Sequence, residues 1–378
     1  VLLILFLSQS LLVKIYSSIS FYPFYAYAIL TAFFSVYRAI PLIYFQINEK
    51  PKIFVFLSMA HFILSSAFIL WFIVGEKAGA IGMLKGQLLS GLIILPLFVY
   101  INLKIINFNF QFKILKNCLA YSLPTIPHVI AGWILSASDR IFIERYLTLT
   151  DLGLYSIGHK IGSAILLLSG AFRKAYSPYY YKLALSKDQN EAKGRLFKSN
   201  RDFFSVMIFG SFTLALFSKE IIFFFLDNRY VDAYKIIPAI IFSNVIVIGT
   251  GLINLSITFE KKTLQVMYMF FLSAIINIIL NYSLIPQYGV FGAVYATLLS
   301  SAIYFCLNYW YSRKCYFIPI DWKRFTFLLT LFTTIVLLFQ FITLQWYYAF
   351  GTKVILVIVL LFLFKKKYFS SAKRRLII

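Results

Sequence analysis

The chain has 378 residues, of which 61% are hydrophobic, 20% aromatic and only 13% charged. Because about a quarter of the residues in a soluble globular domain are charged, this composition excludes that class and indicates a membrane protein. The formal net charge of +23 has no basic soluble domain to carry it. Basic loops that face anionic lipid therefore explain the charge better than nucleic-acid binding does.

Apolar runs of about 20 residues, the length that crosses a bilayer, recur along the whole chain. The polar interval at 182–202 is the longest, and it is too short to fold as a separate catalytic domain. We predict twelve membrane-spanning helices, at residues 1–17, 21–45, 53–74, 80–102, 119–143, 154–181, 203–218, 236–259, 264–285, 290–311, 325–344 and 349–364.

The basic residues outside these spans are distributed unevenly. Twenty-three lysines and arginines lie in the loops and tail that follow even-numbered spans, and five lie in the loops that follow odd-numbered spans. Since loops rich in Lys and Arg stay in the cytoplasm, we expect the even-numbered loops and the C-terminus to be cytoplasmic.

A short repeat links the fourth and tenth predicted spans. Five of the twelve residues from Gly79 to Ser90 recur at a constant offset of 210, from Gly289 to Ser300. The two spans are six helices apart, so they run in the same direction and indicate a parallel repeat of two helix bundles.

The repeat predicts an all-α polytopic fold in four parts. We expect four helices of an N-terminal lobe at 1–103, an interfacial linker at 104–118, a six-helix C-terminal lobe at 119–311, and two additional helices with a basic cytoplasmic tail at 312–378. A matching six-helix N-terminal lobe would need two more helices ahead of Val1, and we expect these to be missing from the sequence.

Eight basic residues fall inside the predicted spans, together with a single carboxylate, Asp139. A charge at bilayer depth costs several kcal/mol, so it persists where it faces a protein interior or a water-filled cavity. An excess of cations there predicts a cavity for an anionic cargo. The eight residues are Lys14, Arg38, Lys85, Arg140, Lys160, Arg173, Lys174 and Lys353.

Some of these cations have a simpler explanation. Lys14 and Lys353 lie near span ends, where a long side chain reaches the headgroups, and we predict that both do so. Arg38 either snorkels to the inner headgroups or binds a diphosphate with its planar guanidinium. Lys85 either snorkels outward or lines the cavity.

Asp139 and Arg140 are neighbours on one predicted helix, about 100° apart around its axis. We therefore expect each to contact another helix rather than its neighbour. Asp139 is a candidate for a proton or sodium site, with a structural ion pair as the alternative. Together with His159 it is a candidate for ion coupling or for a gate.

The sixth predicted span, at 154–181, carries four basic side chains. If it forms one continuous helix, His159 and Arg173 share a face because fourteen residues nearly complete four turns. Lys160 and Lys174 share the adjoining face for the same reason. The three cysteines, Cys118, Cys306 and Cys315, have no metal-ligand spacing, so we predict no metal and no cofactor.

A family resemblance rests on the fifth and sixth predicted spans. It is carried by Ala120-Tyr121-Ser122-Leu123-Pro124, Pro127-His128, Ala131-Gly132-Trp133, Ser138-Asp139-Arg140, Leu152-Gly153-Leu154-Tyr155-Ser156, Lys160-Ile161-Gly162, Ala171-Phe172 and Tyr176-Ser177-Pro178-Tyr179. This stretch resembles bacterial O-antigen and capsule oligosaccharide flippases of the Wzx type. These are polysaccharide biosynthesis proteins of the multidrug/oligosaccharidyl-lipid/polysaccharide exporter superfamily.

The resemblance implies a V-shaped arrangement of two helix bundles that moves an undecaprenyl-diphosphate-linked oligosaccharide across the membrane by alternating access. It implies a transporter rather than an enzyme, with membrane lipids and, as further partners, a polysaccharide polymerase and a chain-length regulator. It also places Arg140 toward the cavity. A substrate path would then use Arg38, Lys85, Arg140, Lys160, Arg173 and Lys174.

Two other classes remain as alternatives. A multidrug exporter of the same superfamily would need an acidic cavity for cationic drugs, which a single intramembrane carboxylate does not provide. A membrane polysaccharide polymerase or polyprenyl-phosphate glycosyltransferase would need a long outer loop or paired carboxylates at a membrane face. The outer loops of this chain are short.

Overall fold

The computed structural model describes residues 21–48, 50–106, 111–123, 125–341 and 346–368. Within these ranges the chain consists of helices and contains no strand, which confirms the predicted all-α fold. The chain divides into two compact units, residues 1–121 and 122–378. The first predicted span, at 1–17, and Lys14 within it lie outside the described residues.

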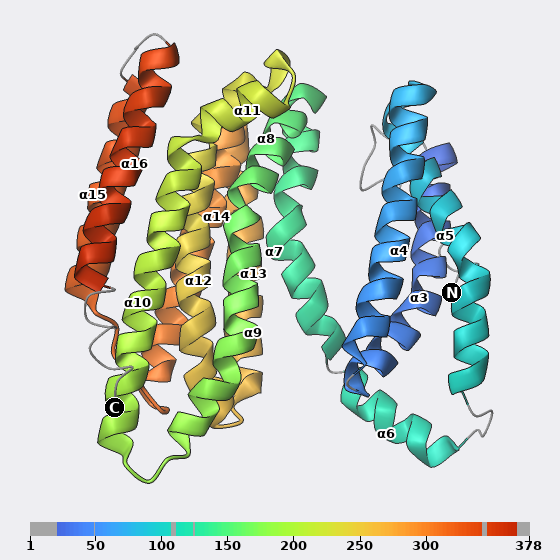
Figure 1. Cartoon of the computed structure of the whole chain (residues 1–378), viewed down its shortest axis with the longest axis horizontal. Helices are drawn as coiled ribbons and strands as arrows, with labels where there is room; N and C mark the ends of the chain where they lie inside the picture. The colour runs from blue at the N-terminus through green and yellow to red at the C-terminus, as the bar shows by residue number, and fades with distance from the viewer. Residues whose placement is uncertain (1–20, 49, 107–110, 124, 342–345, 369–378) are drawn as a thin grey trace. The chain divides into compact units, whose positions relative to one another are not determined.

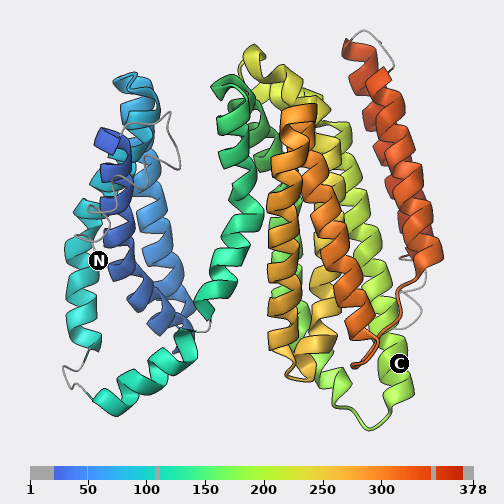
Figure 2. The same cartoon turned by 180° about the vertical axis from the view of Figure 1, so that it is seen from behind.

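The described part of the first unit, from residue 21 onward, contains three long apolar helices. In both views α5 lies beside α3 and α4 (Figures 1 and 2), and it packs closely against both of them. Leu57, Ile94 and Phe98 form the buried core between these helices. The elements are η1 (Phe21–Tyr25), α3 (Ala26–Ile47), α4 (Pro51–Leu70), η2 (Trp71–Gly75), α5 (Gly79–Ile105) and α6 (Phe112–Ser122).

The second unit is built around α12. In its most apolar stretch 72% of the residues are buried, against 17% in α13, because α12 is surrounded by α8, α9, α10 and α14. The elements are α7 (Thr125–Tyr146), α8 (Leu149–Gly162), α9 (Ala164–Ala184), α10 (Gln189–Leu216), α11 (Ser218–Phe225), η3 (Asn228–Lys235), α12 (Ile237–Phe259), α13 (Thr263–Tyr288), α14 (Val290–Ser312), α15 (Trp322–Phe341) and α16 (Trp346–Tyr368).

The C-terminal pair, α15 and α16, packs on the side of this unit formed by α10 (Figure 1). Phe332 of α15 stacks on Phe212 of α10 with ring centroids 4.5 Å apart. Among the described residues, eight helices are long and apolar enough to cross a membrane, or nine if the bent pair α10 and α11 counts as one span. The chain is therefore a multi-pass membrane protein.

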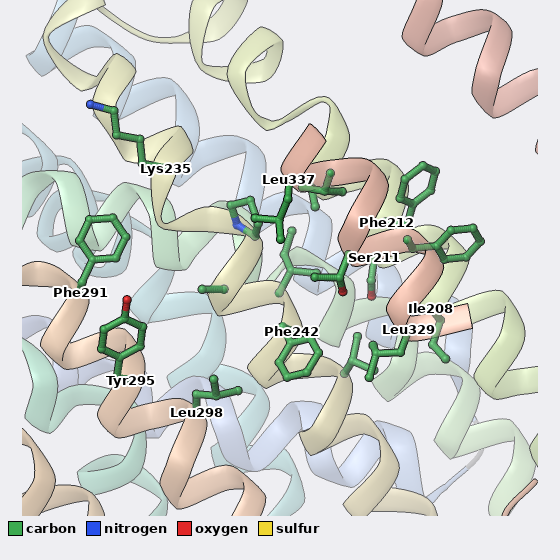
Figure 3. A pocket seen from close by; sticks show the side chains of 18 residues that line it. Ile208, Ser211, Phe212, Lys235, Phe242, Phe291, Tyr295, Leu298, Leu329 and Leu337 are labelled. Carbon is green, nitrogen blue, oxygen red and sulfur yellow. The ribbon is translucent and has the colours of Figure 1, made fainter. Parts of the chain in front are cut away.

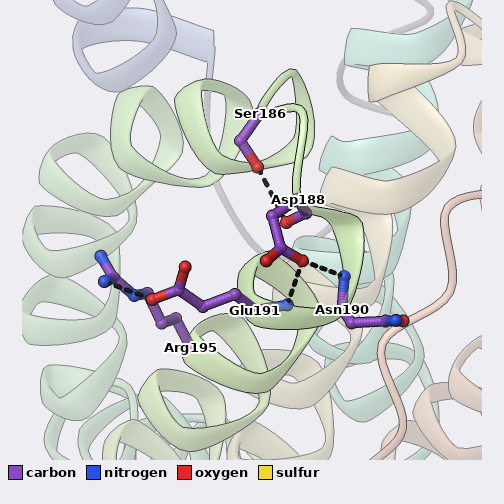
Figure 4. A network of polar contacts seen from close by, with 5 residues as sticks. All are labelled: Ser186, Asp188, Asn190, Glu191 and Arg195. Atoms are coloured by element: carbon purple, nitrogen blue, oxygen red, sulfur yellow. Dashed lines mark hydrogen bonds and ion pairs between the residues drawn. The ribbon is translucent and has the colours of Figure 1, made fainter.

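The composition of the polar interval at 182–202 suggested a loop. In the structure, residues 189–202 of this interval instead form the start of α10. Asp188 caps this helix by accepting hydrogen bonds from the backbone N–H groups of Asn190 and Glu191 at 3.1 and 3.0 Å (Figure 4). One turn later Glu191 pairs with Arg195 at 2.6 Å. An N-cap and a pair at i,i+4 stabilise the start of this helix. Its buried apolar residues, Ala192 and Leu196, are too few among charged neighbours for hydropathy to indicate it.

The predicted span at 154–181 is interrupted at Ser163, between α8 and α9. The carbonyl of Gly162 accepts a hydrogen bond from Asn244 Nδ2 of α12 at 2.9 Å, which satisfies a backbone group at this break. Thr148 and Asp151 form a capping box that begins α8 earlier than hydropathy predicted. The backbone of Ser163 keeps helical dihedral angles, and residues 149–174 still form one candidate membrane span. The shared faces of His159 with Arg173 and of Lys160 with Lys174 stay a prediction.

The sequence repeat corresponds to the same local geometry in both units. Gly79 and Gly289 have φ values of +56° and +59° at the starts of α5 and α14, a conformation that favours glycine. Three residues later, a Cβ on Gly82 would lie 3.0 Å from the backbone of η2, and a Cβ on Gly292 would lie 2.3 Å from the oxygen of Leu284. The repeat thus encodes a tight turn followed by close helix packing.

This packing predicts that Gly292→Ala destabilises the second unit. The new methyl group collides with backbone, which cannot rotate away, so we expect overpacking to cost about 1–3 kcal/mol. The measurement is the thermal unfolding midpoint of the purified protein in detergent. The control is Gly194→Ala on α10, where the added Cβ meets no atom within 4 Å and which should leave the midpoint equal or higher. Equal midpoints for Gly292→Ala and the unaltered chain would contradict the packing argument.

Candidate functional site

Asp139 lies on α7 and is fully buried inside the second unit. Its carboxylate accepts hydrogen bonds from three other helices: Tyr155 of α8, Asn281 of α13 at 2.7 Å and Thr297 of α14 at 2.9 Å. Among the described residues no cation lies within ion-pair distance of it. Within the described part of the chain, the structural ion pair that was one of the two alternatives for Asp139 is thus absent, and neutral donors hold the carboxylate.

The polar cluster continues along α13 and α14. Ser138 donates to Asn277 Oδ1 at 2.8 Å, and Asn277 in turn lies 3.3 Å from Ser300 Oγ. The Oδ1 atom of Asn281 is buried and has no hydrogen-bond partner among the described residues. Sequence reasoning missed these amides, although Asn277 and Asn281 stand one turn apart in an otherwise apolar span and could have signalled a buried polar face.

Arg140 points to a different neighbour from Asp139, as their angular separation on α7 predicted. Its Nη2 atom lies 3.4 Å from Nδ1 of His159 on α8. A guanidinium only donates hydrogen bonds, so this contact requires a neutral His159 with a free lone pair on Nδ1. Protonation of His159 would place two cations side by side, which gives the contact two distinct states.

The remaining predicted cations of the second unit are exposed. Lys160, Arg173 and Lys174 have exposed side chains, whereas His159 is half-buried. Arg173 lies against α12, where a Cβ added to Gly251 would come within 3.0 Å of its Nη1 atom. The small residue therefore lets a guanidinium lie close to the helix. None of these three exposed cations has a carboxylate within ion-pair distance among the described residues.

Arg38 and Lys85 belong to the first unit and are both half-buried. Arg38 lies on α3 about nine residues, or about 14 Å, from the end of that helix. Its side chain lines a pocket of about 280 Å³ together with polar residues of α4 and α5. Lys85 lies on α5 and, among the described residues, has no ion pair.

The prediction that the side chain of Lys353 reaches the lipid headgroups was wrong. The residue is 6% exposed, and its Nζ atom lies 2.7 Å from Oε1 of Glu220, which is 4% exposed. The pair joins α16 to α11 and neutralises one of the eight intramembrane cations. Glu220 lies on α11, a helix of only eight residues.

A second pocket, of about 380 Å³, is lined almost wholly by apolar side chains of α10, α12, α14 and α15. Figure 3 shows Phe242, Leu298 and Leu329 around it, with Lys235 farther along at one end. Lys235 is engaged by Asp232 at 2.8 Å. This pocket is larger than the one at Arg38, but none of the predicted substrate-binding cations lines it.

Helical spans, a repeated glycine turn and buried polar groups within apolar helices define a polytopic membrane protein. A family model described as polysaccharide biosynthesis protein matches residues 1–235. The chain therefore belongs to the polysaccharide biosynthesis protein family, which confirms the family that the motifs of the fifth and sixth spans indicated.

Two curated relatives match parts of the chain. It is 34% identical over 83 residues to Lsg locus putative protein 1 of Haemophilus influenzae, covering 21% of either chain. It is 25% identical over 198 residues to the probable low-salt glycan biosynthesis flippase Agl15 of Haloferax volcanii, covering 51% of this chain and 41% of the relative. The matches thus span about a fifth and two fifths of these relatives' lengths.

A solved structure, the lipid II flippase MurJ in its inward closed conformation, is similar to the fold. The TM-score is 0.73 and the sequence identity 16%, with 98% of this chain and 81% of MurJ covered. At this identity the similarity establishes the fold alone. The helical exporter-like fold predicted from the spans is confirmed.

The buried ion pair predicts a large loss of stability in Lys353→Met. This variant leaves Glu220 buried without its cation, so we expect a loss of about 3–5 kcal/mol and a lower thermal unfolding midpoint. Adding Glu220→Gln removes the uncompensated charge and should restore part of that loss.

The matched control is Lys235→Met, which breaks an exposed pair with Asp232 and should cost less than about 1 kcal/mol. If both single variants had the same small effect, the Glu220–Lys353 pair would not be a buried structural contact.

Proposed function

We propose that this protein is a flippase that moves a lipid-linked oligosaccharide across the membrane through a cationic cavity. The observation that carries the proposal is that Arg38, Lys85, Lys160, Arg173 and Lys174 have no described carboxylate within ion-pair distance, although all lie in membrane helices. Such charges are retained where they have an anionic ligand or water. A diphosphate attached to a lipid is such a ligand.

Membership of the polysaccharide biosynthesis protein family supports a glycan as the cargo. The names of Agl15 and MurJ, both flippases, support transport rather than enzymatic chemistry. We propose an undecaprenyl-diphosphate-linked repeat unit that is used for O-antigen or capsule synthesis. The protein would act in the bacterial inner membrane with a cytoplasmic C-terminus, and a polysaccharide polymerase and chain-length regulator would use its product.

The cations would act in sequence during alternating access. Arg38, Arg173 and Lys174 would meet the diphosphate first, and Lys160, Arg140 and Lys85 would receive it as the protein opens outward. An arginine binds two phosphate oxygens with parallel hydrogen bonds, whereas lysine acts as a point charge. Together they offset the cost of moving a diphosphate through the apolar core.

The Asp139 cluster would couple transport to a cation gradient. The buried carboxylate accepts hydrogen bonds from the amide nitrogen of Asn281 and from the hydroxyls of Tyr155 and Thr297. A carboxylate with hydroxyl oxygens beside it offers ligands that suit a proton or a sodium ion. His159 and Arg140 would form a gate, since protonation of His159 converts their contact into repulsion.

Replacing Lys160 should stop glycan flipping without loss of protein. In proteoliposomes that contain a fluorescent polyprenyl-diphosphate oligosaccharide, we expect Lys160→Gln to lower the flipping rate at least about tenfold, as expected when a charged hydrogen bond to phosphate is lost. Lys187→Gln, which removes an exposed cation from the turn before α10, is the control and should keep the normal rate. A normal rate in Lys160→Gln would remove this residue from the path.

Asp139→Asn should uncouple flipping from the driving ion. The unaltered chain is expected to flip faster under an imposed proton or sodium gradient, and the ion that accelerates it identifies the coupling species. The variant should keep the basal rate but lose this acceleration.

Ser243→Ala is the matched control, because it removes a buried hydroxyl that bonds to Ser301 of α14 at 3.3 Å without contact to the carboxylate. Full acceleration in Asp139→Asn would show that the carboxylate is structural.

A further inference from the structure

We infer that the pocket at Arg38 is an oxyanion-binding site for an acidic sugar of the cargo, built within the first unit alone. This inference extends the proposed function, because it names a chemical class of substrate. The pocket has a volume of about 280 Å³, below the roughly 300–1,000 Å³ of typical ligand sites. It therefore suits one sugar residue rather than a whole oligosaccharide.

The polar lining of the pocket comes from three helices, and on each helix the lining residues are spaced so that they lie on one face. Thr31, Ser35 and Arg38 follow one another at i, i+4 and i+7 on α3, and His61 and Ser65 stand at i and i+4 on α4. On α5, Gln87 lies one turn before Gly91, where a Cβ would meet no atom within 4 Å. Spacing of this kind turns every one of these residues toward a common space.

Several of the donors in this space are not used by the protein itself. The buried Nδ1 atom of His61 has no hydrogen-bond partner among the described residues. The side chains of Arg38, Ser65 and Gln87 likewise form no hydrogen bond or ion pair within the described part of the chain. Leaving a buried polar atom such as His61 Nδ1 unsatisfied costs about 1–3 kcal/mol, so this atom indicates a ligand that satisfies it. The half-buried side chains of Arg38, Ser65 and Gln87 are available to the same ligand.

The chemistry of these donors selects the ligand. One guanidinium forms two parallel hydrogen bonds to one carboxylate or phosphate group. The neutral amide, hydroxyl and imidazole groups beside it suit the hydroxyls of a sugar, which donate and accept hydrogen bonds in the same way. We therefore commit to a sugar that carries an oxyanion, and the carboxylate of a uronic acid and a phosphate group share this chemistry.

The pocket also lies too deep for Arg38 to serve as a headgroup anchor. His61 is near the middle of the apolar segment Pro51–Gly75, and Gln87 is about 12 Å from the start of α5 at Gly79. The hydrocarbon core is about 30 Å thick, so these residues meet well inside it. A charged side chain at that depth that lines a polar pocket indicates a site with a function.

The test measures equilibrium binding to the purified full chain in nanodiscs, with radiolabelled glucuronate, inorganic phosphate and glucose as separate probes. We expect saturable binding of glucuronate, of phosphate or of both, and none of glucose. Whichever anion binds identifies the source of the oxyanion. Arg38→Gln should weaken that binding at least about tenfold.

Gln87→Ala should weaken it by a smaller factor, and it serves as a second variant if Arg38→Gln does not fold. Lys104→Gln is the matched control, because it removes an exposed cation from α5 that stacks on Tyr100 and lies outside the pocket. Binding that is unaffected by Arg38→Gln and Gln87→Ala, or equal binding of glucose, would overturn the inference.

The pocket and the proposed function can fail independently. Flipping of a neutral lipid-linked glycan by the unaltered chain, together with loss of that flipping in Lys160→Gln, supports the transporter even if no anion binds at Arg38. Anion binding that depends on Arg38 without any flipping would support the site and contradict the transporter.

Discussion

The low dielectric of the hydrocarbon core is the constraint on which the rest of this structure depends. A polar group there must be bonded inside the protein or meet water or a ligand, because an unsatisfied one costs far more than in a soluble domain. The second unit meets this demand internally: Asp139 is bonded to three helices, and Lys353 is neutralised by Glu220. The intramembrane cations that have no described carboxylate partner must therefore meet water or an anionic ligand.

The two units share the same glycine turn between helices, but the polar side chains near this turn differ. Both use a glycine with positive φ followed by a glycine pressed against the preceding helix. In the second unit the helices at this turn, α13 and α14, contribute Asn277, Asn281 and Thr297 to a bonded cluster. In the first unit α5 instead contributes Gln87 to an open polar pocket. The same turn thus lies next to a hydrogen-bonded polar cluster in the second unit and next to an open polar pocket in the first.

Most of the fold could be predicted from the sequence, because a membrane helix is encoded by a contiguous apolar run and the repeat by a few glycines. The errors arose where other interactions determine the structure. The start of α10 depends on the Asp188 cap, and the carbonyl of Gly162, where α8 ends, is bonded by Asn244, 82 residues away in sequence. The partners of Asp139 and Lys353 also come from distant helices, which periodicity alone does not pair. The residue types at the site were thus predictable, but their contacts were not.

The polar groups of the Asp139 cluster and of the Arg38 pocket differ in how many hydrogen bonds they already make. This difference determines where a ligand can gain binding energy. The Asp139 cluster is already bonded, so a ligand gains there mainly through the one unpartnered oxygen of Asn281, as a small cation would. The Arg38 pocket holds a guanidinium, an imidazole nitrogen and an amide that make no bond to a described residue. An anion gains there from several donors that need not first leave other partners. The unpartnered donors of the Arg38 pocket thus favour an anion, whereas the bonded carboxylate of Asp139 favours a proton or a small cation.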